Sequence, residues 1–295
     1  MDGMTGTAGV IGLGIMGGAM ARHMVAGGLS VSGFDPSGEA AKTARGNGVD
    51  VLGSASEVAE KAEVVVVSLP SPAALHAVAS EVAGSSANGC VLMETSTLKL
   101  ADKEAARDVL GSAGHTLLDC PLSGTGQQAQ TGDLAVFTSG DEDAVAKCIP
   151  VIETFSRENK YCGPFGNGSR MKFVANHLVT IHNVAAAEAM VLGMKSGLDA
   201  ALIYDVISTS AATSRMFEVR GKYMVDNDYS DVGMSNRLYQ KDLDVITSFA
   251  ADVHCPVNLF ASAVQPYRAT LDNGNAESDT AAVCAVLEEQ ARVKR

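Results

Sequence analysis

Two polar side chains, one helical turn apart, lie in an apolar stretch of this 295-residue chain. Lys172 and Asn176 are four residues apart, so on a helix they share one face. A lysine on a buried helix is desolvated, which lowers its pKa and suits it to proton transfer. The alternative is a surface lysine that extends its ammonium group into water beside a helix-face asparagine.

A second polar group consists of Ser123, Gly124 and Thr125, shortly after an expected strand that ends at Asp119. The hydroxyl of Ser123 and the backbone N–H groups of Gly124 and Thr125 could receive a carboxylate. Glycine lets a ligand approach the backbone closely. The alternative is a loop that uses Pro121 and Gly124 only to make its turn.

Two further cations have open interpretations. Lys241 is followed by Asp242 in a later helix and could reach a cofactor from the second half of the chain. The alternative is a solvated Lys–Asp pair. Arg215 either adds an anion contact or is a solvated helix residue.

Glycines near the start of the chain predict a site for a phosphate-bearing ligand. Gly12, Gly14 and Gly17 form the pattern G-x-G-x-x-G between an apolar run and an Ala/Met-rich stretch. Gly12 permits the tight turn, Gly14 lets the backbone approach a pyrophosphate, and Gly17 lets the helix pack on the strand. The helix start at Ile15 and Met16 adds N–H groups and a positive dipole end.

Asp35 indicates that this ligand is a dinucleotide. It ends the next apolar run, 18 residues after Gly17, which is about the spacing of the carboxylate that binds the adenosine ribose of NAD. Glu39 adds to the repulsion of a 2′-phosphate, so we expect NAD to be preferred. NADP is the weaker alternative, because Lys42 and Arg45 are a helical turn or more away. The alternative is a Gly-rich turn that binds no ligand, followed by a surface aspartate.

The elements that must position these residues alternate along the first half. Short apolar runs predict strands at residues 8–12, 29–35, 64–69, 90–94 and 115–119. Helical patterns lie near residues 16–27, 37–46, 54–61, 72–82 and 98–112. This alternation predicts an α/β domain with a parallel, doubly wound sheet. The valine run at residues 64–67 is typical of a strand covered on both faces. Two more strands are expected at residues 134–139 and 160–162, with a helix at 141–154 between them.

The pattern changes to helices alone after residues 163–168. Helical stretches cover residues 169–196, 199–209, 213–226, 234–254, 256–272 and 279–293. We therefore expect a dinucleotide-binding domain at residues 1–165, followed by an all-helical domain at residues 166–295 that is joined to it by one long helix. Residues 184–194 are too apolar for a solvated face, and we expect them to be buried against the sheet domain and a second subunit.

Composition limits the partners. The net charge of −12 disfavours nucleic acid and anionic membrane surfaces, which need a basic footprint. A span at residues 173–192 would bury several polar groups, so a buried helix is the better interpretation. Histidines and carboxylates show no metal-ligand spacing, and we expect no metal site.

The cysteines and the first residues point to the cytoplasm. None of the six cysteines forms a C-x-x-C pair, and we interpret them as reduced thiols. Residues 1–7 lack the features of a signal peptide.

Four motifs occur in one order: the Gly-rich opening, D-x-P-x-S-G at residues 119–124, G-x-G-x-x-x-K-x-x-x-N at 166–176, and K-D-L at 241–243. Together they resemble the β-hydroxyacid dehydrogenase family, of the 3-hydroxyisobutyrate dehydrogenase and tartronate semialdehyde reductase type. The resemblance implies a Rossmann domain, a long interdomain helix and an all-α domain that mediates homodimers or homotetramers.

The resemblance also implies roles for the residues. Lys172 would be the catalytic lysine and Asn176 would orient the reacting hydroxyl. Ser123 and Gly124 would hold the substrate carboxylate. Further contacts with the cofactor are expected at Leu69, Pro70, Ser96 and Lys241.

These roles predict an NAD-dependent dehydrogenase of a small 3-hydroxy acid, in which Lys172 takes the hydroxyl proton. One alternative is an NAD(P)H-dependent reductase of a small semialdehyde acid. An imine-reducing relative and a non-catalytic NAD-binding regulator are further alternatives, and the presence of Lys172 counts against both. The chain departs from the family pattern at Thr125 and Ala175, which leaves the particular acid open.

Overall fold

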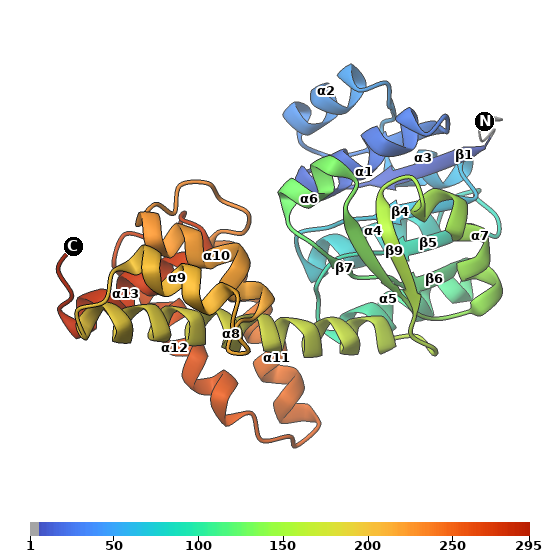
Figure 1. Cartoon of the computed structure of the whole chain (residues 1–295). Helices are drawn as coiled ribbons and strands as arrows, with labels where there is room; N and C mark the ends of the chain where they lie inside the picture. Colours follow the sequence, from blue (N-terminus) through green and yellow to red (C-terminus); the bar gives the residue numbers. More distant parts are fainter. Residues whose placement is uncertain (1–5) are drawn as a thin grey trace. The chain divides into compact units, whose positions relative to one another are not determined.

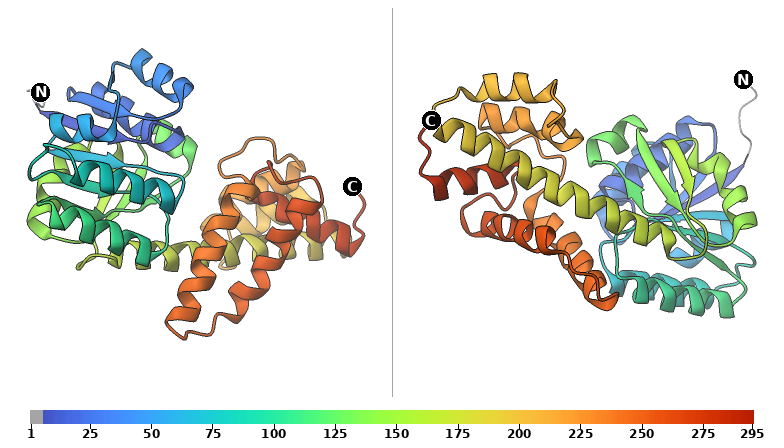
Figure 2. Two further views of the ribbon diagram at one scale, coloured as in Figure 1. Left: turned by 180° about the vertical axis from the view of Figure 1, so that it is seen from behind. Right: turned by 60° about the horizontal axis from the view of Figure 1, so that its bottom comes forward.

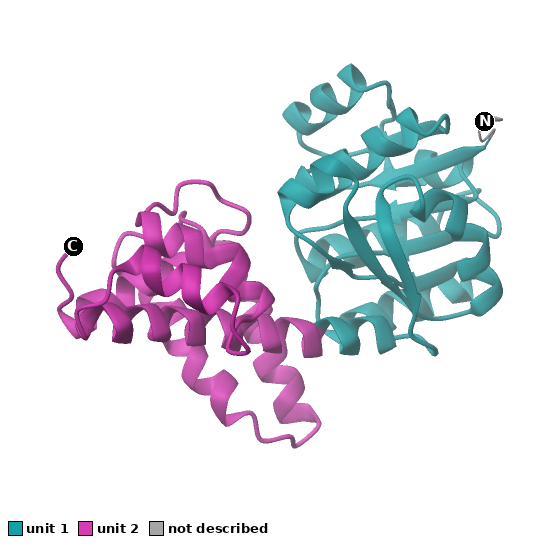
Figure 3. Cartoon of the chain, viewed as in Figure 1, with its two compact units in different colours: residues 1–172 teal, residues 173–295 magenta. Residues whose placement is uncertain are grey.

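The computed structural model describes residues 6–295. The chain divides into two compact units, unit 1 (Met1–Lys172) and unit 2 (Phe173–Arg295) (Figure 3). The expected domain boundary between residues 165 and 166 stays a prediction. The expected absence of a signal peptide rests on residues 1–7, of which 1–5 lie outside the described residues.

Unit 1 is built on a six-stranded sheet with the order β3-β2-β1-β4-β5-β6 (Figure 1). All its neighbouring strands are parallel, as predicted. The strands are β1 (Thr7–Ile11), β2 (Ser30–Phe34), β3 (Asp50–Val51), β4 (Val64–Val67), β5 (Val91–Glu94) and β6 (Thr116–Asp119). The edge strand β3 was not predicted, because two residues are too few to show a pattern.

Helices cover both faces of this sheet, as its two other views show (Figure 2). Side chains of α3, α4 and α5 pack on one face, and side chains of α1 and α7 pack on the other. Ser37, Ser54 and Ser71 cap three of the helices by accepting a backbone N–H, which explains where these helices begin. The helices are α1 (Ile15–Ala26), α2 (Gly38–Gly46), α3 (Ala55–Lys61), α4 (Pro72–Ala83), α5 (Leu100–Ser112) and α7 (Glu142–Ile152).

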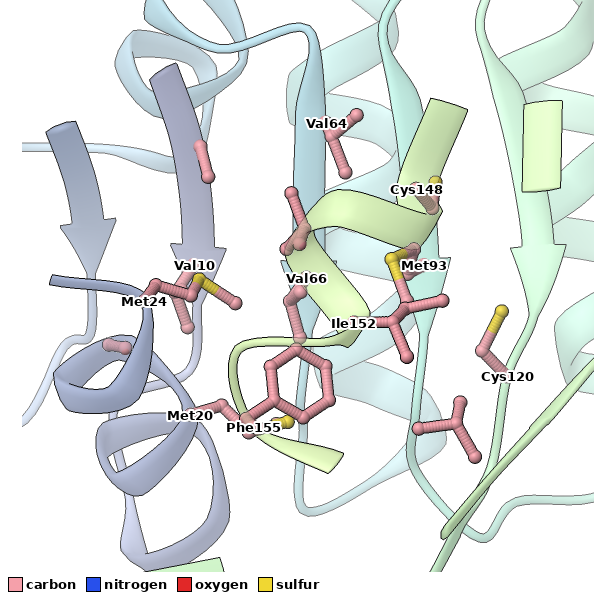
Figure 4. Packing of buried hydrophobic residues seen from close by; sticks show 14 of the residues in the cluster. Val10, Met20, Met24, Val64, Val66, Met93, Cys120, Cys148, Ile152 and Phe155 are labelled. Carbon is pink, nitrogen blue, oxygen red and sulfur yellow. The ribbon is translucent and has the colours of Figure 1, made fainter. Parts of the chain in front are cut away.

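Strand β4 shows how one strand serves two cores. Val64 and Val66 belong to the cluster that contains Ile152 and Phe155 (Figure 4). The alternate residues Val65 and Val67 belong to the other cluster, with side chains of α3, α4 and α5. Successive side chains of a strand point to opposite faces, so a strand covered on both faces is apolar throughout. The prediction from the valine run is confirmed.

A second, three-stranded sheet has the order β7-β8-β9, with β7 antiparallel and β9 parallel to β8. Its elements are β7 (Leu122–Ser123), α6 (Gly126–Thr131), β8 (Leu134–Thr138) and β9 (Ser156–Tyr161). The strand expected at residues 160–162 therefore begins earlier, at Ser156. Strand β9 lies at a sheet edge and is mostly exposed, so it is polar and carries no apolar pattern.

Unit 2 is helical, and between residues 173 and 295 the structure has no strand, as expected. Its first helix is the continuation of α8 (Asn167–Lys195). The others are α9 (Ala200–Ser208), α10 (Arg215–Asp226), α11 (Asn236–Asp252), α12 (Asn258–Asp272) and α13 (Val283–Ala291), with a 3₁₀ turn η1 (Thr280–Ala282) before α13. The carboxylate of Asp279 accepts the N–H of Ala281 and thereby caps that turn.

The apolar segment at residues 184–194 contributes to the core of unit 2 itself. Ala187 and Met190 are fully buried there, in the cluster that contains Leu243 and Tyr267. Its burial against a sheet domain and a second subunit stays a prediction. Within residues 6–295, no helix has the length and apolar character needed to cross a membrane.

Candidate active site

The turn at residues 12–17 contains two glycines that its own packing requires and one that it does not. A Cβ on Gly12, where φ is +90°, would lie 2.1 Å from the carbonyl oxygen of Ser68. A Cβ on Gly17 would lie 1.8 Å from the carbonyl oxygen of Gly12. A Cβ on Gly14 would meet nothing within 4 Å. The open space at Gly14 fits a cofactor pyrophosphate, with the N–H groups at the start of α1 as donors.

Asp35 holds the Gly-rich turn from the end of β2. Its Oδ2 accepts the N–H of Leu13 at 2.7 Å, and its Oδ1 accepts the N–H of Ser37 at 2.7 Å. A carboxylate offers about four lone-pair sites, so these two bonds leave acceptor capacity for ribose hydroxyls. The side chain is half-buried, which keeps it accessible to a ligand.

A cavity of about 470 Å³ lies beside Gly14, along α1 and α2. Ser37 and Glu39 line it. Arg22 is the basic side chain among its described lining residues. The guanidinium of Arg22 donates to the carbonyl oxygen and to Oε1 of Gln130, at 2.7 and 2.9 Å. A cofactor lying here would meet one carboxylate and one cation that is already engaged.

The ends of β4 and β5 are tied together next to this turn. The N–H of Leu69 donates to Oγ of Ser96 at 2.8 Å, and Oγ1 of Thr95 donates to the carbonyl oxygen of Val67 at 2.8 Å. The N–H of Ser96 donates to Oε1 of Glu94 at 2.9 Å. These residues lie at the carboxyl edge of the sheet, where ligands of open α/β sheets bind.

The loop at Ser123 leaves the same edge after β6. Gly124 has a φ of +147°, and a Cβ there would lie 2.6 Å from Leu134. Thr125 caps α6: its Oγ1 accepts the N–H of Gln128, and its own N–H donates to Oε1 of Gln128 at 3.0 Å. The N–H of Thr125 is therefore engaged, whereas Ser123 is half-buried and does not take part in the cap. The role of Thr125 towards a substrate stays a prediction.

Helix α8 begins in unit 1 with three tight contacts. The N–H of Gly168 donates to Oγ of Ser139 at 2.9 Å. The N–H of Ser169 donates to Oδ2 of Asp119 at 2.7 Å, and its hydroxyl donates to Oδ1 of Asp119 at 2.7 Å. Lys172 follows Ser169 by three residues and is half-buried. The position of Lys172 in unit 1 is thus set by the first turn of α8.

Behind this turn lies a cluster of three buried charges. The ammonium of Lys103 on α5 is 2.6 Å from Oε2 of Glu94 and 2.8 Å from Oδ1 of Asp119, and all three side chains are 0% exposed. Burial alone would lower the pKa of Lys103, but the carboxylates of Asp119 and Glu94 outweigh it and hold the pKa above its ordinary value. The sequence reasoning missed this cluster. Its only visible signal was a carboxylate at the last residue of two neighbouring strands.

In unit 2, Asn176 has a carboxylate partner. Its Nδ2 donates to Oδ2 of Asp242 at 3.0 Å, and both residues are 7% exposed. Lys241, the neighbour of Asp242, is exposed. The interpretation of these two residues as a solvated pair is therefore wrong for Asp242. Arg215 is 79% exposed and lies 3.1 Å from Glu218, which fits the solvated interpretation of that residue.

The buried thiols do not form a reactive centre. Burial raises the pKa of Cys90, Cys148 and Cys284 to about 12, and that of Cys120 well above its ordinary value. Thiolate chemistry at neutral pH is disfavoured at these positions. Residues 6–295 contain no group of three or more His, Cys, Asp or Glu side chains arranged to hold a metal ion.

Unit 1 thus carries most of the predicted site at one edge of its sheet. The residues expected to bind the cofactor there are Gly12, Gly14, Ile15, Met16, Gly17, Asp35, Leu69, Pro70 and Ser96. Asn176 and Lys241 belong to unit 2. Their placement relative to the cofactor stays a prediction.

Two family models match the chain. Residues 7–163 match the NAD binding domain of 6-phosphogluconate dehydrogenase. Residues 166–287 match the domain described as NAD-binding of NADP-dependent 3-hydroxyisobutyrate dehydrogenase.

Individual relatives match over nearly their whole length. The L-threonate dehydrogenase of Escherichia coli strain K12 is 30% identical over 284 residues, which are 95% of this chain and 94% of that protein. A probable 3-hydroxyisobutyrate dehydrogenase of Mycobacterium tuberculosis is 31% identical, over 97% of this chain and 99% of that protein. A solved structure of the Mycobacterium tuberculosis 3-hydroxyisobutyrate dehydrogenase with L-serine superimposes with a TM-score of 0.89 at 30% identity, covering 96% of this chain and 99% of that one.

Proposed function

This chain belongs to the β-hydroxyacid dehydrogenase family, and from that premise we propose that it oxidises a small 3-hydroxy acid, with Lys172 as the general base and NAD as the preferred cofactor. The expected family, fold class and reaction class are confirmed: the protein is an oxidoreductase of hydroxy acids that acts on CH–OH with NAD or NADP. The individual site residues and the preference for NAD are proposals.

The substrate class follows from what the relatives' names share. Threonate, 3-hydroxyisobutyrate and L-serine each combine a carboxylate with a hydroxyl group on carbon 3. A site for such a molecule needs an anion contact, a base for the hydroxyl proton and a hydride acceptor. The Ser123 loop and Lys172 would supply the first two from this chain.

One observation carries the proposal: Asp119, the last residue of β6, fixes the helix turn that bears Lys172 and also begins the loop that bears Ser123. A base must lie within hydrogen-bond reach of the proton it removes, and the carboxylate contact must keep it there. One residue therefore links both parts of the proposed site in unit 1, the α8 turn through its side chain and the Ser123 segment through the backbone.

The residues then divide the work. Ser123 and the N–H of Gly124 bind the substrate carboxylate. Lys172 takes the proton from the hydroxyl on carbon 3 and returns it in the reverse direction. Asn176 keeps one N–H on Asp242 and donates the other to the substrate oxygen, without competing for its proton. Lys241 contacts the cofactor or substrate. When bound, the nicotinamide supplies the hydride acceptor.

The preference for NAD rests on the charges around the predicted ribose site. Asp35 accepts ribose hydroxyls and repels a 2′-phosphate. Glu39 lines the neighbouring cavity and adds negative charge. Arg22, the cation in that cavity, is bound to Gln130 and would have to exchange this partner to bind a phosphate.

The semialdehyde reductase is the same site running in reverse, since both directions share one transition state. An imine-reducing relative or a non-catalytic regulator would have no use for Lys172 as a base. We also propose a homodimer or homotetramer, and a cytoplasmic location, where all six free thiols would remain reduced.

A substrate panel tests the function. L-threonate, both enantiomers of 3-hydroxyisobutyrate, and L-serine would each be offered with NAD and with NADP, and the reduced nicotinamide followed by its absorbance. Turnover of at least one 3-hydroxy acid is expected, with higher kcat/KM for NAD. The controls are 2-hydroxy acids of matched size that have no hydroxyl group on carbon 3. Turnover of these alone, or of none of the acids, would contradict the proposal.

A further inference from the structure

The buried cluster of Glu94, Lys103 and Asp119 joins the ends of β5 and β6 to the first turn of α8 in unit 1. Glu94 ends β5 and accepts the N–H of Ser96 at 2.9 Å. Asp119 ends β6 and accepts both the N–H and the hydroxyl of Ser169. Lys103 bridges the two carboxylates from α5. The N–H of Cys120 also donates to the carbonyl oxygen of Glu94 at 2.8 Å, so the first residue of the Ser123 loop is included.

Fold stability alone is a weak reason for such a cluster. Removing a charge from water is costly, and buried ion pairs can often be replaced by well-packed apolar side chains without loss of stability. The neighbouring positions on this helix and these strands are filled by apolar residues such as Ala106, Leu110 and Leu118. What apolar side chains could not supply is the set of directional bonds to Ser96 and Ser169.

The bonds to Ser169 connect the cluster to the proposed active site, because Ser169 and Lys172 lie on the same helix. Lys172 follows Ser169 by three residues on α8, a rise of about 4.5 Å. Gly168 allows the helix start to pass close to the strands: a Cβ there would lie 2.4 Å from the carbonyl oxygen of Phe137. A shift of Asp119 would therefore move the turn that carries Lys172 relative to Ser96 and to the Ser123 loop.

We infer that Glu94, Lys103 and Asp119 are positioning residues for the reaction: they hold the base-bearing turn of α8, the carboxylate-binding loop and the Ser96 segment in register. This inference rests on the proposed function of Lys172 and Ser123. The cluster touches neither substrate nor cofactor. It acts through Ser169 and Ser96.

The main test is Asp119→Asn, which keeps the size of the side chain but weakens the bonds to Lys103 and Ser169. At a temperature well below its melting point, we expect kcat to fall about 100-fold, the cost of misplacing a catalytic group by about 1 Å. The dissociation constant of NAD should change far less than kcat, because the turn at residues 12–17 and Asp35, which carry most of the expected cofactor contacts, are untouched. The primary isotope effect with substrate deuterated on carbon 3 should rise, since the chemical step becomes slower.

A gentler variant keeps the inference testable if Asp119→Asn does not fold. Ser169→Ala removes only the hydroxyl donor, and the N–H bond to Asp119 remains. We expect roughly a 5-fold lower kcat, the equivalent of one modest hydrogen bond.

The matched control is Asp279→Asn in unit 2. Asp279 is also buried, lies 3.4 Å from the guanidinium of Arg220 and accepts the N–H groups of Gly233 and Met234. This variant should lose stability but keep kcat. If it lost as much kcat as Asp119→Asn at the same drop in melting temperature, the cluster of unit 1 would have only a structural role.

Hydrogen exchange provides a readout that does not depend on activity. Amides at residues 167–173 should exchange faster in Asp119→Asn than in the wild type. In Asp279→Asn the same amides should exchange at the wild-type rate. Unchanged exchange, or an unchanged kcat in folded Asp119→Asn, would overturn the inference. If the wild type turns over no hydroxy acid but exchange still quickens, the proposed function is overturned and the anchoring of α8 stands.

Discussion

Asp35 and Asp119 stand at the carboxyl ends of strands of one sheet, yet their surroundings differ. Asp35 is half-buried, has no cation at hydrogen-bond distance among the described contacts, and accepts the N–H groups of Leu13 and Ser37. Asp119 is 0% exposed and is paired with Lys103. Both hold a helix start in place, Asp35 just before α1 and Asp119 at the first turn of α8.

The difference shows that burial decides whether a carboxylate can bind a ligand or only other groups of the protein. A half-buried carboxylate keeps lone pairs that a ligand can reach. A fully buried one needs a cation and hydrogen-bond donors of the protein itself, and these use its acceptor capacity. The surroundings of Asp35 therefore leave acceptor sites for the proposed contact with the cofactor, whereas those of Asp119 suit a carboxylate that bonds only to the protein itself.

The largest expected effect concerns the group that Asp119 holds in place. Lys172→Ala should lower kcat by roughly 10²–10⁴, the usual contribution of general acid–base catalysis. NAD binding should be unchanged, because the Gly-rich turn and Asp35 remain. The measurement is steady-state kinetics on the best acid of the panel, with NAD affinity by fluorescence titration. Lys195→Ala, in the last turn of the same helix, is the control and should keep full activity. A variant that kept most of its kcat, with chemistry shown to limit the rate, would mean that Lys172 is not the base.

The second effect tests how much the fold depends on the pairing of Asp119 and Glu94 with Lys103. Lys103→Met leaves two buried carboxylates without their cation, and we expect the free energy of unfolding to fall by about 3–5 kcal/mol. Lys61→Met is the control: its exposed pair with Asp50 should contribute less than about 1 kcal/mol. Urea unfolding followed by circular dichroism measures both variants.

The pH dependence of that loss has a definite sign. The pKa of Lys103 is raised in the folded protein, so its stabilising effect is fully present below the ordinary value of 10.5 and is lost only as the pH rises through the folded value. The difference between wild type and Lys103→Met should therefore not shrink between about pH 7 and about pH 9. A difference that already shrinks in this range would show that the ammonium is not held as the geometry indicates.

The two aspartates also differ in how much of their surroundings could be predicted from the sequence. Asp35 could be singled out from the sequence because it follows the Gly-rich turn at a short, recurrent spacing; its contact with the ribose stays a prediction. The parallel sheet was likewise visible in the alternation of apolar runs and helical patterns. The role of Asp119 could not be predicted, because its partners Lys103 and Ser169 are 16 and 50 residues away. The same holds for Asn176 and Asp242, 66 residues apart. Only the folded chain shows which charges are buried together.

The third effect is at the loop proposed to bind the substrate carboxylate. If Ser123 makes that contact, Ser123→Ala removes one hydrogen bond to a charged group, and we expect KM for the acid to rise by about 10- to 100-fold with little change in kcat. Initial-rate kinetics at saturating NAD separates the two constants. Ser112→Ala on the exposed end of α5 serves as the control. A loss confined to kcat would place Ser123 at the reacting carbon and not at the carboxylate.

The smallest effect decides whether Asp35 reads the ligand or only holds the turn. Asp35→Asn keeps one oxygen acceptor for Leu13 or Ser37 but removes the negative charge. If the carboxylate faces the ribose, kcat/KM with NAD falls while kcat/KM with NADP falls less or rises. The ratio of the NAD value to the NADP value then decreases by about 10-fold. If Asp35 only holds the Gly-rich turn, both values fall together and the ratio stays constant. Asp50→Ala, an exposed aspartate at the next strand, controls for loss of net negative charge. A wild-type enzyme that already favours NADP would show that Asp35 belongs with Asp119, as a carboxylate that serves the scaffold.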